Sequence, residues 1–183
     1  MSILKPRMIL LFSGGMDSTL LLKMAIQMGY DPYCLIFDYG QKHIKEIEFA
    51  QKQCLDNKIA FDILCVPLKV HSKLLDGTSP YKDVSPYHVP GRNLIFLSIA
   101  ASIAESRGID LIWYGANYED RKNLFPDCYQ EWIYRLNQLF EINGSLKVRV
   151  EAPLLGMTKE TIGLLKETYN IKDTEIFSGY GEQ

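Results

Sequence analysis

Seven consecutive residues near the N-terminus combine two glycines, three hydroxyl side chains and one acid: Ser13, Gly14, Gly15, Met16, Asp17, Ser18 and Thr19. Glycine adopts positive φ without a steric penalty, and adjacent glycines before a helix can aim their backbone N–H groups at an anion. The hydroxyl groups supply further donors. Asp17 would repel a bare phosphate, so we expect it beside a cation such as Mg²⁺. The string predicts a loop that binds the phosphates of a nucleotide.

This string is not the Walker phosphate loop, because that motif places a Lys directly before its final Ser or Thr and here Asp17 holds that position. It instead resembles the pyrophosphatase loop of the N-type ATP pyrophosphatases. Those proteins clasp the β- and γ-phosphates of ATP while an acceptor attacks the α-phosphate. An ordinary glycine-rich turn between a strand and a helix is the plainer alternative.

Apolar runs alternate with helical patterns, and the glycine string lies between the first of each. Strands are predicted at 8–12, 33–37, 61–66, 110–115 and 146–150, and helices at 20–28, 44–57, 89–106, 129–140 and 158–169. Strand–helix–strand units of this spacing form parallel sheets. We therefore expect an α/β fold, with a doubly wound, mainly parallel five-stranded sheet flanked by helices, Rossmann-like. Such sheets bind ligands where their strands end, and Tyr39, Gln41 and His43 follow the second strand.

Length and composition favour a single domain over residues 1–183, with a long loop at about 67–91 and a short irregular C-terminal tail. The net charge of −2 gives no strong nucleic-acid footprint, and no apolar run approaches the length of a membrane span. Four cysteines occur without C-x-x-C spacing, at Cys34, Cys54, Cys65 and Cys128. Buried, reduced thiols in a cytoplasmic protein fit this pattern best.

Further strings follow in a fixed order: Asp-Tyr-Gly-Gln-Lys-His at 38–43, Val-Pro-Gly-Arg-Asn at 89–93, Gly115 with Asn117 and Asp120, Pro-Asp-Cys at 126–128, and Thr158-Lys159. Together with the glycine string they resemble the 7-cyano-7-deazaguanine synthase family over roughly residues 8–165. The resemblance implies the adenine nucleotide alpha hydrolase-like fold, the use of ATP and Mg²⁺, and a homodimer. It also implies 7-carboxy-7-deazaguanine as substrate and ammonia as the amine that makes an amide and then a nitrile.

The implied chemistry is adenylation, which turns a carboxylate oxygen into a leaving group before an amine attacks. On the resemblance, the catalytic residues are Asp17, Ser18, Arg92 and Lys159. The nucleotide is expected against Ser13, Gly14, Gly15, Asp17, Ser18, Thr19 and Phe37. The deazaguanine is expected against Tyr39, Gln41, His43, Arg92, Asn93, Asn117, Asp120, Phe125 and Asp127.

These substrate contacts agree with the chemistry of the base. Its donor edge needs an acceptor, for which Asp120 and Asp127 are both candidates. Its carboxylate needs a cation, and Arg92 fits. Its flat face needs an aromatic ring, either Tyr39 or Phe125. Plainer interpretations remain: a helix-start residue for Arg92 and a turn acid for Asp120.

This sequence departs from the family's pattern at two places. Tyr129 stands where an Arg normally follows Pro-Asp-Cys, and the four-cysteine zinc cluster is not expected because no Cys follows Cys128. We therefore expect no zinc and a more open site, which would admit a protein amine as acceptor, as in divergent relatives found beside antiviral systems. Two alternatives are a tRNA thiolation enzyme of the same fold and a catalytically inactive nucleotide-binding scaffold.

Overall fold

The computed structural model describes residues 4–42, 44–78, 85–122, 125–144 and 147–177. Its centre is a five-stranded sheet in the order β3-β2-β1-β4-β5, in which every neighbouring pair is parallel. The strands are β1 (Arg7–Leu11), β2 (Asp31–Asp38), β3 (Ala60–Cys65), β4 (Leu111–Trp113) and β5 (Arg149–Glu151). The chain moves outward from β1 in one direction to β3, then returns to β4 on the other side of β1. The β1–β4 boundary is therefore the point at which such sheets open a crevice for ligands.

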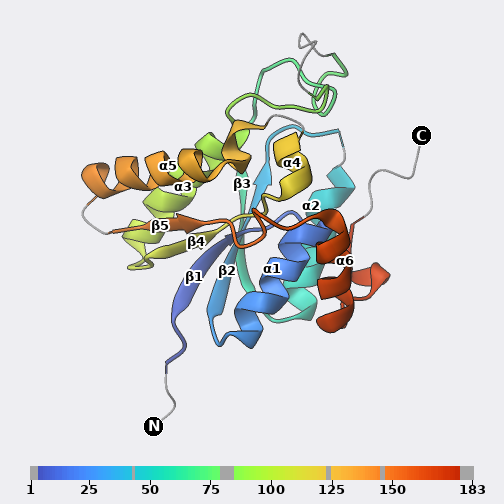
Figure 1. Cartoon of the computed structure of the whole chain (residues 1–183), viewed down its shortest axis with the longest axis vertical. Coiled ribbons are helices and arrows are strands. Elements are labelled where there is room, and N and C mark those ends of the chain that lie inside the picture. The colour runs from blue at the N-terminus through green and yellow to red at the C-terminus, as the bar shows by residue number, and fades with distance from the viewer. Residues whose placement is uncertain (1–3, 43, 79–84, 123–124, 145–146, 178–183) are drawn as a thin grey trace.

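Helices cover both faces of this sheet (Figure 1). One face carries α1 (Met16–Gln27), α2 (Ile44–Asp56) and α6 (Lys159–Thr168), whereas the other carries α3 (Arg92–Ser106) and α5 (Gln130–Asn143). Side chains of β1 alternate between the two cores: Met8 and Leu10 pack towards α1, and Ile9 packs towards α3. All three are fully buried, as expected for a central parallel strand.

The predicted α/β architecture is confirmed, but three short elements were not anticipated. The polar stretch after β4 contains α4 (Tyr118–Lys122) and the 3-10 helix η1 (Pro126–Cys128), and a second 3-10 helix, η2 (Asp173–Glu175), follows α6. In addition, α1 begins four residues before the predicted start, so Asp17, Ser18 and Thr19 belong to the start of this helix, whereas Ser13 precedes it.

The expectation of four buried thiols is wrong for one cysteine. Cys34, Cys54 and Cys128 are buried, but Cys65 is exposed. Cys65 is the last residue of β3, an edge strand that pairs with β2 on one side, so no strand of the described sheet covers its other side.

The long loop after β3 lies over the end of β2. Its described parts, 67–78 and 85–91, contain no helix or strand. Main-chain hydrogen bonds tie it down: Leu68 N–H donates to the Tyr39 carbonyl at 3.1 Å, and Lys42 N–H donates to the Leu74 carbonyl at 3.0 Å. Within the described ranges no helix is long and apolar enough to cross a membrane.

The outer edge of β5 is closed by one side chain instead of a sixth strand. Asn137 of α5 donates from Nδ2 to the Val150 carbonyl at 2.9 Å and accepts from Val150 N–H at 2.7 Å. Val150 is buried, so both main-chain groups would lose their partners if this amide were removed.

We predict that Asn137→Ala lowers the free energy of unfolding by about 1–3 kcal/mol, because it leaves a buried donor and acceptor unsatisfied. Thermal unfolding followed by circular dichroism measures the effect. Gln138→Ala, the neighbouring exposed position on the same helix, is the matched control. Equal melting temperatures for the two variants would show that water replaces the amide without cost.

Candidate active site

The glycine loop joins β1 to α1 at the crevice between β1 and β4. Gly14 has a φ of +76°, and a Cβ there would lie 3.1 Å from the Cα of Ala50, so only glycine fits. Gly15 is the N-cap of α1, with extended backbone. The N–H groups of the first helical turn have no acceptor within the helix and are available to an anion.

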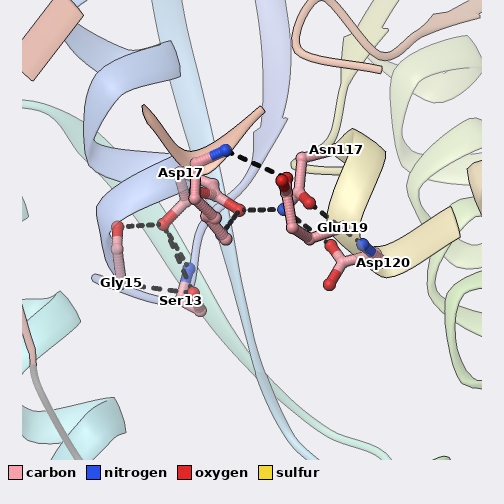
Figure 2. Close-up of polar contacts among 8 residues, drawn as sticks. Ser13, Gly15, Asp17, Asn117, Glu119 and Asp120 are labelled. Carbon is pink, nitrogen blue, oxygen red and sulfur yellow. Dashed lines mark hydrogen bonds and ion pairs between the residues drawn. The ribbon is translucent and has the colours of Figure 1, made fainter. Parts of the chain in front are cut away.

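Two hydroxyl groups brace the inside of this loop (Figure 2). Ser18 Oγ donates to the Gly15 carbonyl at 3.1 Å and lies 3.3 Å from Ser13 Oγ. Ser13 Oγ in turn accepts from Gly15 N–H at 3.3 Å. Thr19 differs, because its Oγ1 lies on the side of the loop that faces α2. It is 3.4 Å from the Gly14 carbonyl oxygen and 3.4 Å from Gln53 Oε1 of α2.

Asp17 lies between the glycine loop and the residues that follow β4. Its carboxylate forms an ion pair with Lys159 Nζ at 2.8 Å and accepts from Asn117 Nδ2 at 2.7 Å. The loop and β4 approach closely here, since a Cβ on Gly115 would lie 3.3 Å from the Asp17 Cβ. The Lys159 ammonium places a positive charge beside Asp17, whose carboxylate oxygens are of the type that Mg²⁺ prefers.

Asn117 connects this acid to a second one (Figure 2). Its Nδ2 donates to Asp120 Oδ2 at 2.8 Å as well as to Asp17, and its Oδ1 accepts from Asp120 N–H at 3.1 Å. Asn117 is fully buried. Burial raises the pKa of Asp120, the neighbouring Asp17 and Asp127 carboxylates raise it further, and Lys159 opposes them. Asn117 and Lys159 thus stabilise two carboxylates that would otherwise repel each other.

The opposite wall comes from β2, α3 and η1. Arg92 donates from Nη1 to the Tyr39 hydroxyl at 3.2 Å, with its guanidinium 5.5 Å from the Tyr39 ring centroid. Asn93 Nδ2 donates to the Asp127 carboxylate, and the Tyr114 hydroxyl donates to the Asp127 carbonyl. Asp127 and Arg92 are therefore held on adjoining parts of one wall.

Two cavities meet between these walls. The larger, about 720 Å³, extends from the glycine loop across β2 to α3, and the smaller, about 420 Å³, lies between the end of the long loop and η1. Both are lined by Arg92, Asn93 and Asp120. Such volumes suit small-molecule ligands, and the shared lining makes one continuous site of two chambers.

Most residues proposed from the sequence line these cavities. The larger is lined by Ser13, Gly15, Asp17, Ser18, Phe37, Tyr39, Gln41, Arg92, Asn93, Asp120 and Lys159, and the smaller adds Phe125 and Asp127. Gly14, Thr19 and Asn117 lie behind the lining instead. His43 lies outside the described residues.

Two lining residues have additional structural roles. Gln41 is buried, accepts from Tyr39 N–H at 2.9 Å and donates to the Phe37 carbonyl at 3.2 Å, so its amide holds the turn after β2. The Phe37 ring stacks on Phe96 with centroids 4.0 Å apart.

Sequence reasoning assigned no site role to several residues here, among them Gly115, which was noted only within the string that contains Asn117 and Asp120. Gly115 lines both cavities, and Glu119 caps α6 by accepting from Lys159 N–H at 2.9 Å. His88 lies in the smaller cavity with its ring stacked on Phe125, and burial lowers its pKa. His88 belongs to the long loop, which has no regular sequence pattern from which its position in the site could be predicted. Gly115 directly follows an apolar strand, and a glycine at such a position was a usable signal for the site.

Comparison with known proteins agrees with this architecture. A family model described as queuosine biosynthesis protein QueC matches residues 7–183. The 7-cyano-7-deazaguanine synthase of Pseudoalteromonas atlantica is 33% identical over 165 residues, which span 84% of this chain and 74% of that protein.

Two solved structures are similar in fold. A predicted subunit of tRNA methyltransferase from Methanocaldococcus jannaschii gives a TM-score of 0.61 over 88% of this chain and 76% of that chain. The U34-tRNA thiolase NcsA of Methanococcus maripaludis, solved with its 4Fe–4S cluster, gives 0.59 over 98% and 62%. Both are 18% identical, so they bear on the fold alone.

The parallel sheet and these structural neighbours define the class as an α/β protein of the adenine nucleotide alpha hydrolase-like fold. Within that class the chain belongs to the QueC family, a family of enzymes whose model spans nearly all of it. The resemblance inferred from the sequence strings is confirmed.

Because its pKa is raised on folding, the Asp120 carboxylate destabilises the folded protein at pH values above the ordinary Asp pKa of about 3.9. This cost is absent at lower pH, where the group is protonated in both folded and unfolded states. We predict that Asp120→Asn melts at a higher temperature than the parent protein at pH 7, and that the difference shrinks below about pH 4.

Thermal melts over this pH range provide the measurement. Asp31→Asn, an exposed acid on β2, is the matched control and should show no such trend. A lower melting temperature for Asp120→Asn at pH 7 would contradict the electrostatic interpretation.

Proposed function

We propose that this protein is an ATP-dependent ligase that adenylates the carboxylate of 7-carboxy-7-deazaguanine and transfers the activated base to an amine. The observation that carries the proposal is that the two cavities meet at Arg92 and Asp120. The larger cavity is lined by the glycine loop, and the smaller one is lined by carboxylate and aromatic side chains. The relatives' name, 7-cyano-7-deazaguanine synthase, supports the substrate class.

In this proposal the larger chamber takes ATP. The first-turn N–H groups of α1 hold the outer phosphates together with the Ser13 hydroxyl and with the Ser18 hydroxyl, which would turn from the Gly15 carbonyl to do so. Phe37 lines the end assigned to adenine. Lys159 forms an ion pair with Asp17, and in the proposal it can exchange this partner for a bound phosphate. Asp17 would hold Mg²⁺ through the phosphates, and the ion would supply charge neutralisation at the α-phosphate.

The smaller chamber takes the base. Asp127 and Asp120 offer acceptors to the donor edge of the guanine ring, while Phe125 and His88 offer a flat face. Arg92, at the junction, pairs with the carboxylate and aims one of its oxygens at the α-phosphate. That oxygen attacks phosphorus, and pyrophosphate leaves.

The amine nitrogen then attacks the acyl carbon of the adenylate, AMP leaves with the bonding electrons, and the amine loses a proton. With ammonia the product is an amide. The amide oxygen then attacks the α-phosphate of a second ATP and releases pyrophosphate, after which AMP leaves with the bonding electrons and the nitrogen loses its two protons to form the nitrile. A protein amine would stop at the amide. We favour ammonia because the relatives' name specifies a cyano product.

A thiolation function has less support. Burial raises the pKa of Cys128, and Asp127 and Asp120 raise it further, so this thiol stays protonated and is a poor nucleophile. An inactive scaffold is also disfavoured, because a site without turnover gains nothing from holding Asp17, Asp120 and Lys159 together. A homodimer, a cytoplasmic location and the absence of zinc are further parts of the proposal, which sedimentation, fractionation and elemental analysis would test.

We predict that pyrophosphate release from ATP and Mg²⁺ depends on added 7-carboxy-7-deazaguanine, and that Asp17→Asn lowers kcat/KM by about 100-fold, or about 2.7 kcal/mol. The substitution keeps the shape but removes the charge that faces the phosphates. Coupled pyrophosphate detection measures the rate, and circular dichroism checks folding.

Asp62→Asn, an acid in a surface ion pair with Arg107, is the matched control and should turn over normally. Normal turnover by a folded Asp17→Asn variant would refute the assigned role.

We further predict that mass spectrometry after incubation with ATP, Mg²⁺, the base and ammonia finds the free amide and nitrile. Replacing ammonia by a candidate partner protein should give no adduct. A stable adduct on that protein, with no free nitrile in the ammonia reaction, would reassign the acceptor to a protein amine.

A further inference from the structure

The carbonyl oxygen of Gly14 is held on the side of the loop that faces α2 and the segment after α6. Gln53 Nε2 donates to it at 3.2 Å, and Phe177 N–H donates to it at 3.0 Å. Thr19 Oγ1 approaches it at 3.4 Å, but this one hydroxyl hydrogen is shared with the Gln53 side chain and the Glu175 carbonyl at similar distances. The amide of Gln53 and the N–H of Phe177 are therefore the main restraints.

Gln53 does not line either of the two cavities described above. It is buried on α2, and its Nε2 and Oε1 both point to the glycine loop and Thr19. A buried amide is costly unless its groups are paired, so this position is specialised for the loop. Ala50, one turn earlier on α2, lies so close to Gly14 that a Cβ on Gly14 would come within 3.1 Å of the Ala50 Cα.

Residues 173–177, which we call the strap, bring the second donor to the loop. Glu175 is anchored to Lys23 of α1 by an ion pair at 2.8 Å between partly buried side chains. The Phe177 ring packs against Phe49 of α2 with centroids 5.9 Å apart. Ile176 and Phe177 also line the larger cavity, so the strap contacts both the loop and the space in front of it.

The geometry of a trans peptide makes this restraint matter to a ligand. The C=O of Gly14 and the N–H of Gly15 belong to one planar unit and point in opposite directions. Holding the carbonyl towards Gln53 and Phe177 directs the Gly15 N–H to the Ser13 and cavity side. If this peptide flipped, a carbonyl oxygen would face the phosphates in place of a donor.

We propose that Gln53 is a positioning residue and that the strap acts with it to prevent this flip, so that the loop is set for phosphate before the ligand arrives. The idea rests on the proposed phosphate-binding function of the loop. Preorganised donors cost no rearrangement on binding. By thermodynamic linkage, phosphate in the loop must also tighten the strap.

Gln53→Met keeps the length of the side chain and removes its hydrogen bonds. Gln51→Met, the same change at a partly buried position of α2 with no contact to the loop among the described residues, is the matched control. Calorimetry with inorganic pyrophosphate should give a Kd about tenfold higher for Gln53→Met and unchanged for Gln51→Met. Hydrogen exchange should show faster exchange of the Phe177 N–H in Gln53→Met, and pyrophosphate should slow it in the parent protein.

A second pair of variants tests the strap without altering α2. Phe177→Pro removes the N–H, and Phe177→Ala removes only the ring. Ile176 has φ −128° and ψ 128°, which are compatible with a following proline. Phe177→Pro should bind pyrophosphate several-fold more weakly than Phe177→Ala.

Equal affinities within both pairs, with unchanged exchange at Phe177, would overturn the proposal. Faster exchange in Gln53→Met with no pyrophosphate binding by the parent protein would support the restraint on Gly14 but refute the phosphate function of the loop.

Discussion

The parallel pairing of β1 with β4 is the constraint on which the site depends. These strands are neighbours in the sheet although about 100 residues separate them, and the chain after each one turns outward at the same edge. Gly115 has no side chain, so the glycine loop can approach to within van der Waals distance of the turn after β4. Asp17 and Asn117 consequently meet, and a residue of α6 completes the contact.

Charge is the second organising feature. Asp17 and Asp120 share one amide donor, and a low-dielectric setting makes their repulsion expensive. Lys159 compensates for part of it and Asn117 for another part, which explains why a fully buried Asn lies in a site of this kind. A site that concentrates acids in this way favours ligands that bring cations or ring N–H groups with them.

Rigidity comes from behind the site. The loop is braced on its inner side by Ser13 and Ser18 and on its outer side by Gln53 and the strap. The turn after β2 is fixed in the same manner by Gln41, whose amide bonds to the main chain on both sides of it. Buried amides thus fix the backbone at two of the segments that line the larger cavity.

The sequence by itself determined the order of the strands and of the longer helices, though not the short helices α4, η1 and η2. It also determined the position of the glycine loop, because apolar periodicity and glycine preference are local properties. It also predicted most of the residues that line the cavities, because they follow strands whose carboxyl ends lie at the same edge of the sheet. Only the tertiary structure decided that Asn117 and Thr19 stand behind the lining, that Glu119 caps α6, and that Gln53 reaches the loop. Those contacts join residues from different elements, and no local pattern encodes which side chains will meet when the elements pack.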